Sequence, residues 1–181
     1  MITVVNDVIT YIYRMKNYKL FVSKCNEGLR LPEELDNYIK DQGCKLIEIF
    51  DNQNPSRRWY CYFSDFIKGE FKVSYKTMFE ISKIAPLFYV QHEFEVENKD
   101  YKKLNPVLDG FDSQPYTKEQ AMLYDEIVLV LSKYGYKELS FAEMNEVVGD
   151  IKMPEDVSVF GPQVTVEHLL FNDVLDLNSN E

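Results

Sequence analysis

The chain has two histidines, and each lies near acidic residues at a spacing that could support acid-base catalysis or metal binding. His92 precedes Glu95 by three residues in QHEFEVE, and VEHLLFND brings Glu167, His168 and Asp173 together. An imidazole and a carboxylate act jointly only when they share a face. A strand would place His92 and Glu95 on opposite faces, and the adjacent Glu167 and His168 share no face of a helix or strand. We therefore expect no metal site at either place.

The cysteines are the other residues that could do chemistry. Cys25, Cys44 and Cys61 are widely spaced, with no C-x-x-C pair and no histidine nearby in the sequence. The chain also lacks G-x-x-x-x-G-K-[ST], G-x-G-x-x-G, G-x-S-x-G and H-E-x-x-H, and it has only seven glycines. We expect buried free thiols, no phosphate-binding loop and no cofactor. Pairing of a cysteine with a histidine in space stays open.

One short run combines basic and aromatic residues. Arg58 and Trp59, in the segment RRWY at 57–60, are residue types favoured at binding hot spots, and arginine with aromatics can also hold a single-stranded base. The same alternation is typical of a hairpin strand with Trp59 in the core beside Cys61 and Phe63. We keep Arg58 and Trp59 as candidate binding residues and, in so acidic a chain, expect no nucleic acid partner.

The net charge of −10 is concentrated at one end of the chain. Residues 1–137 contain 19 basic and 20 acidic side chains, whereas residues 138–181 contain Lys152 and ten acids, so the two parts carry −1 and −9. Such a field repels nucleic acid and anionic membranes and speeds the encounter with a basic partner. An acidic solvated surface is the alternative, since it also aids solubility.

Five of these acids are candidate binding residues. Glu143, Glu146 and Asp150 recur at steps of three to four residues through a helix expected from Ser140 to Gly149. A further two acids, Glu155 and Asp156, follow the end of this helix closely. We expect all five to lie on or beside one surface.

Helical patterns occupy both ends of the chain. The first lies within residues 3–24, with Val4, Val8, Ile12 and Met15 as its apolar stripe, and a second covers residues 31–43, with Pro32 at the first helical position and a stop at Gly43. Thr117 with Gln120 and Ser140 with Glu143 form capping boxes that begin two helices in the last third. Residues 163–177 fit either a helix or a strand.

The middle of the chain has the two-residue period of strands. We expect strands at 45–50, 58–63, 71–76 and 87–97, the first two forming a hairpin. The fold class is therefore α+β: an antiparallel sheet of about four strands with one solvated face, packed by N-terminal and C-terminal helices. We expect a single globular domain over 1–181 with a disordered polar tail at 178–181.

His92 can now be placed within its strand. It shares a face with Phe88, Val90, Phe94 and Val96, which favours a hydrogen-bonded core residue. The alternative is a pocket near His92 that serves catalysis or small-molecule binding. No apolar run is long enough to span a membrane and the N-terminus is a poor signal peptide, so we expect a cytoplasmic protein without a membrane partner.

In general character, the chain resembles the immunity proteins of bacterial toxin systems, which are small, acidic, aromatic-rich and without a catalytic signature. The resemblance transfers no individual functional residue. It implies a non-catalytic binding protein that neutralises a basic protein partner, for example a nuclease toxin, through electrostatic capture followed by aromatic packing. The competing hypothesis is an enzyme or small-molecule-binding domain with its pocket near His92.

Overall fold

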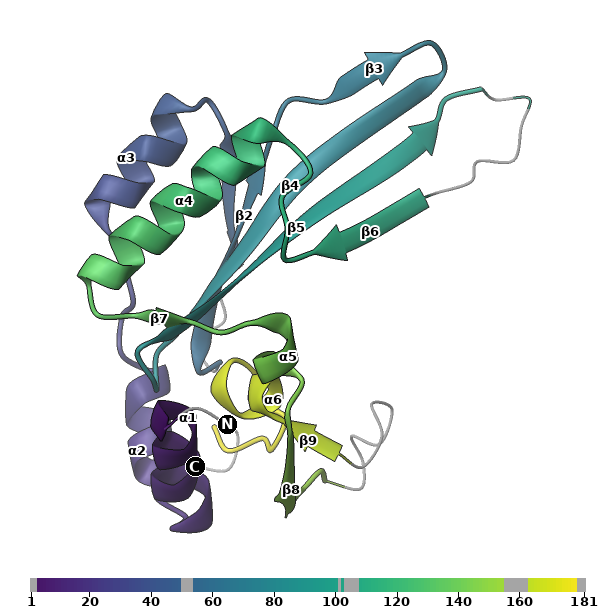
Figure 1. Cartoon of the computed structure of the whole chain (residues 1–181). Coiled ribbons are helices and arrows are strands. Elements are labelled where there is room, and N and C mark those ends of the chain that lie inside the picture. The colour runs from purple at the N-terminus through teal and green to yellow at the C-terminus, as the bar shows by residue number, and fades with distance from the viewer. Residues whose placement is uncertain (1–2, 50–53, 101, 103–107, 155–162, 179–181) are drawn as a thin grey trace.

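The computed structural model describes residues 3–49, 54–100, 102, 108–154 and 163–178 and has the expected α+β architecture (Figure 1). Its helices are α1 (Thr3–Val8), the π-helix η1 (Ile9–Arg14), α2 (Tyr18–Cys25), α3 (Glu33–Asp41), α4 (Lys118–Lys133), α5 (Phe141–Met144) and α6 (Val166–Leu170). Its strands are β1 (Lys45–Ile49), β2 (Ser56–Tyr62), β3 (Phe66–Lys68), β4 (Phe71–Ser82), β5 (Leu87–Asn98), β6 (Leu108–Asp112), β7 (Lys137–Glu138), β8 (Val147–Lys152) and β9 (Gln163–Thr165).

The central sheet contains all four predicted strands in the predicted antiparallel arrangement. Its order is β1-β2-β4-β5-β6, with β3 added beside β4 and β7 pairing with β5 in parallel. Strand β4, with 12 residues, is twice as long as the predicted segment 71–76, whereas β5 extends the predicted segment 87–97 by one residue. The strand β6 is not among the predicted ones. The strands β8 and β9 form a separate two-stranded sheet.

One face of the sheet, called the helix face here, is covered by α3 and α4, which lie side by side (Figure 1). Trp59, Phe79, Phe88 and Val90 point to it and pack against apolar residues of the two helices, such as Leu35 and Ile127. Stacking of the Trp59 and Phe79 rings, with centroids 5.3 Å apart, fixes β2 against β4.

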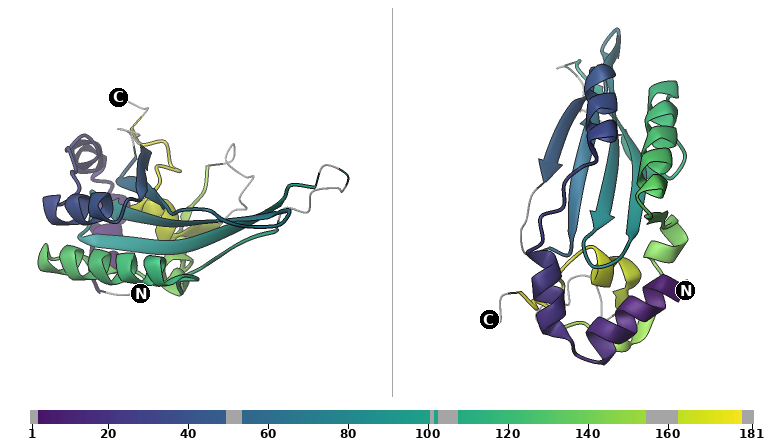
Figure 2. Two further views of the ribbon diagram at one scale, coloured as in Figure 1. Left: turned by 90° about the horizontal axis from the view of Figure 1, so that it is seen from above. Right: turned by 90° about the vertical axis from the view of Figure 1, so that its left-hand side faces the viewer.

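The opposite face is covered only over part of its length. Met78, Leu87 and Tyr89 pack there in a second core with residues of η1, α2 and α6, including Phe21 and Leu169. Beyond these helices the β4–β5 hairpin projects with β3 and β6 (Figures 1 and 2). The prediction of one solvated face therefore holds only for this projecting half.

The predicted stripe of the N-terminal helix is only partly confirmed. The segment divides into α1, η1 and α2. Of the predicted stripe, Ile12 is buried and Val8 packs partly buried against the core, whereas Val4 and Met15 are exposed. The other buried residues are Val5, Ile9, Tyr13 and Phe21. The backbone of η1 forms hydrogen bonds across five residues, such as Met15 N to Thr10 O at 3.0 Å. The buried residues Val5, Ile9 and Ile12 still recur at helical steps, so the prediction chose a neighbouring stripe at the start of the segment. The wider turn of η1 affects only the positions that follow it, such as Met15.

The helix predicted from Ser140 to Gly149 is also wrong beyond its first turn. Ser140 and Glu143 do form a capping box, but α5 ends at Met144. The β-branched Val147 and Val148 instead begin β8, which pairs with β9. Long-range pairing therefore overrides the local helical spacing.

Other predictions at the helix ends are confirmed. The capping box of Thr117 and Gln120 begins α4, and Gly135 follows its end with a φ of 82°. In the second predicted helix Gly43 follows the end with a φ of 68°, but Pro32 is the N-cap, so α3 begins one residue later than predicted. The ambiguous segment after residue 163 contains both a strand, β9, and a helix, α6. No helix in the described ranges is both long and apolar enough to cross a membrane.

Candidate functional site

The uncovered half of the sheet presents a hollow that we call the open face. It is formed by side chains on the side away from α3 and α4, and it holds a cavity of about 790 Å³. The cavity wall includes Lys45 and Tyr62 from the β1–β2 hairpin, Lys76 from β4, Glu93 from β5 and Phe111 from β6. A concave surface with mixed polar and aromatic walls is a common setting for binding.

Several charges of the open face are paired. Lys76 Nζ lies 2.8 Å from a Glu93 carboxylate oxygen, and Lys72 Nζ lies 3.4 Å from Asp65 and 3.7 Å from Glu97. Burial alone would lower the pKa of Lys76, but the Glu93 carboxylate outweighs it and raises that pKa. Partly exposed pairs of this kind are screened by solvent and contribute little to stability, so they order the surface more than they stabilise it.

Two carboxylates of the open face lie opposite each other instead of opposite a base. Glu95 of β5 and Asp109 of β6 are direct partners in the antiparallel ladder, and both are exposed. Charged side chains lining the large cavity are Lys45, Lys72 and Lys76 against Asp65, Glu93, Glu95, Glu97 and Asp109, which gives 3 − 5 = −2. The open face thus has a negative excess.

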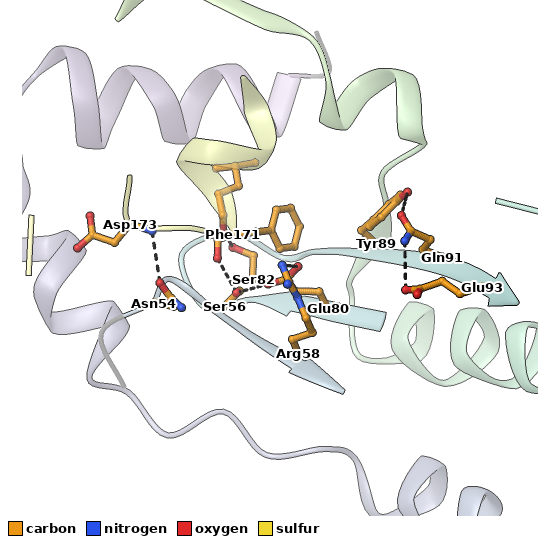
Figure 3. Close-up of polar contacts among 11 residues, drawn as sticks. Asn54, Ser56, Arg58, Glu80, Ser82, Tyr89, Gln91, Glu93, Phe171 and Asp173 are labelled. Atoms are coloured by element: carbon orange, nitrogen blue, oxygen red, sulfur yellow. Dashed lines mark hydrogen bonds and ion pairs between the residues drawn. The ribbon is translucent and has the colours of Figure 1, made fainter. Parts of the chain in front are cut away.

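A polar network closes the inner end of the open face (Figure 3). The Glu80 carboxylate is buried, accepts a hydrogen bond from Arg58 Nη2 at 2.9 Å and lies 2.6 Å from Ser56 Oγ. Burial raises the pKa of Glu80, and Arg58 and Ser56 oppose this shift. Ser56 Oγ is also 2.7 Å from the Phe171 carbonyl, so the network ties the end of α6 to the sheet.

A second cavity of about 180 Å³ continues the open face beneath α5. Its wall includes Arg58, Tyr60, Phe141 and Glu167, and it shares Glu93 with the larger cavity. The Phe141 ring lies 5.9 Å from the Phe111 ring of β6, which joins the rims of the two cavities. The two hollows therefore form one continuous surface.

His92 lies on the helix face, away from the open face, and its predicted burial is confirmed. It is 0% exposed, its Nδ1 is 2.9 Å from Thr77 Oγ1, and its ring packs edge-on against Tyr124 at 5.8 Å. Burial lowers the pKa of His92 to about 4, against a weaker opposing effect of Asp112. At neutral pH the ring is uncharged, and it lines neither of the two cavities of the open face.

The predicted roles of Arg58 and Trp59 separate in the structure. Trp59 is 2% exposed and packs under the helices, where a partner cannot reach it, which corrects the binding role considered for it. Arg58 is on the other face of the same strand, bonded to Glu80, and lines the small cavity. Alternation along β2 accounts for the difference, because adjacent residues point to opposite faces.

The five acidic candidates are not brought together by one helix. Glu143 is bonded to Ser140 in the capping box, and Asp150 lies in β8, where it pairs with Arg14 of η1 at 2.6 Å. Glu146 lies between these elements, and Glu155 and Asp156 lie outside the described residues. The acids that line the two cavities of the open face are instead Asp65, Glu93, Glu95, Glu97, Asp109 and Glu167.

The remaining chemical candidates are not arranged as an active site. Burial raises the pKa of Cys25 to about 11 and that of Cys61 still further, so both thiols are protonated at neutral pH. The Thr165 hydroxyl and the His168 side chain form a capping box at the start of α6. Within the described ranges, no three His, Cys, Asp or Glu side chains are grouped as metal ligands.

Comparison with known proteins identifies no relative of this chain. The chain matches no protein-family model, no curated protein and no solved structure.

Proposed function

We propose that this chain is a non-catalytic binding protein that neutralises a basic protein, in the manner of an immunity protein, by covering it with the open face. The main observation in support of this function is the exposed pair of Glu95 and Asp109, which lies beside the exposed aromatic ring of Phe111. Two carboxylates directly opposite each other destabilise a sheet slightly. A cationic partner would remove that repulsion on binding.

Exposed apolar side chains on the projecting half of the sheet support the same function. Ile67 of β3 and Phe111 of β6 are each about half exposed, and their ladder partners Lys72 and Glu93 place them on the open face. Phe66, Phe71 and Leu108 are also about half exposed, but they lie on the other face of the projecting half. Aromatic and aliphatic anchors surrounded by charged groups are typical of protein interfaces. In this proposal the acids guide the encounter, and Ile67 and Phe111 hold the complex.

The test is capture of the partner from a lysate of the native host, followed by association kinetics. A basic partner should be recovered, and its association rate should fall steeply as the ionic strength rises above about 0.15 M, where screening acts within about 8 Å. An acidic partner, or an association rate that does not change with salt, would overturn the proposal.

A further inference from the structure

The small cavity under α5 has an unbalanced charge at its wall. Arg58 is bonded to Glu80, and Glu93 is paired with Lys76. The carboxylate of Glu167, by contrast, forms no hydrogen bond or ion pair with any residue of the described ranges. The charged side chains of the wall, Arg58, Glu93 and Glu167, sum to 1 − 2 = −1.

The half-buried position of Glu167 makes this charge effective. Its carboxylate adds to the effect of burial in raising the pKa of Tyr89, which reaches about 12. The Glu167 carboxylate also adds to the effect of burial in raising the pKa of Glu80. A charge that two neighbouring buried groups sense is weakly screened, and it would attract a cation more strongly than a fully exposed acid would.

The rest of the wall suits a flat cation. The Tyr60 ring already holds a cation, since Lys76 Nζ lies 5.3 Å from its centroid, and the exposed Phe141 ring lines the same cavity. Asn145 donates its amide hydrogen to the Phe141 carbonyl at 2.8 Å, and its side-chain oxygen can still accept a hydrogen bond. A guanidinium group combines stacking on aromatic rings with several donated hydrogen bonds.

We propose that this cavity binds an arginine side chain of the protein partner, with the guanidinium between the Glu167 carboxylate and the Phe141 ring. The inference rests on the proposed function, since a partner bound to the open face would lie next to the cavity. The inference names the chemical group of the partner that makes one contact, a guanidinium. The negative charge of the open face alone would accept any cation.

The experiment titrates the full chain with N-acetyl-arginine amide and follows backbone amide signals by NMR. Saturable shifts are expected at Gln91, Phe141 and Asn145. Glu167→Gln should weaken this binding about tenfold, the loss expected for a charge-assisted hydrogen bond. The matched control Asp125→Asn, on the exposed side of α4, should leave it unchanged.

Two further probes decide whether the cavity selects a guanidinium. N-acetyl-citrulline amide, a neutral analogue of similar shape, should bind at least about tenfold more weakly, and N-acetyl-lysine amide should bind more weakly than the arginine probe. Equal binding of citrulline, shifts away from the cavity, or an unchanged affinity in Glu167→Gln would overturn the inference. Because no partner is needed, these results are independent of the capture experiment.

Discussion

Glu95 and Asp109 face each other across the β5–β6 ladder, and both carboxylates point into the open face. Replacing Asp109 with threonine removes a like-charge contact and adds a residue that favours strands. We expect Asp109→Thr to raise the free energy of unfolding by about 0.2 to 1 kcal/mol, measured by chemical denaturation. The gain should shrink in high salt, and a loss of stability in low salt would show that the two charges do not repel.

The buried Glu80 depends on Arg58 for its charge. Arg58→Ala leaves the carboxylate buried without its cationic partner, and we expect a loss of about 3 kcal/mol in stability at neutral pH. The folded-state pKa of Glu80 is raised, so its uncharged form is favoured in the folded protein and the cost of burying it decreases as pH falls. The destabilisation should therefore be smaller at pH 5 than at pH 8 in thermal unfolding. An equal loss at both pH values would contradict a charged Glu80.

His92 makes the stability of the fold sensitive to acid. Its folded-state pKa of about 4 lies below the ordinary histidine pKa of 6.5, so the unfolded chain binds the proton first as pH falls. Stability is then lost between about pH 6.5 and 4, by an amount on the order of 3 kcal/mol. Comparing the unfolding free energies of wild type and His92→Phe over this window isolates the effect. The variant should lose less stability on acidification, and parallel curves would show that His92 does not titrate as described.

Gly110 of β6 provides space for an aromatic ring. A Cβ atom at this position would lie 2.8 Å from the Phe94 ring, which also packs edge-on against Tyr116 at 4.8 Å. We expect Gly110→Ala to destabilise the protein by about 1 to 3 kcal/mol through overpacking. Gly149 of β8 has no atom within 4 Å of such a Cβ, so Gly149→Ala should change the melting temperature little. Similar effects of the two substitutions would contradict the packing at Phe94.

The sequence was sufficient for features that depend on neighbouring residues. The period of two in residues 87–97 placed His92 on the apolar face, and the Thr117 capping box marked the start of α4. Features that depend on distant pairing were missed. The short segment 108–112 becomes a strand by pairing with β5, and only that register brings Asp109 opposite Glu95.

The same reasoning explains the error at the acidic candidates. Helical spacing predicts one surface for Glu143, Glu146 and Asp150. In the structure the segment after Met144 leaves the helix and forms β8, because it pairs with β9. Glu167 was considered only as a metal ligand beside His168. Its place in the small cavity depends on how α6 packs against β5, which local spacing cannot show.

The most direct measurement of the central claim is the association rate of the captured partner with two charge-matched variants. Asp109→Lys reverses an acid of the open face, and Asp125→Lys makes the same change on exposed α4 behind the sheet. If the open face is the binding surface, Asp109→Lys should slow association by about tenfold or more at low salt. Asp125→Lys should have a much smaller effect, and both proteins should remain folded by circular dichroism. Equal association rates for the two variants would contradict binding through the open face.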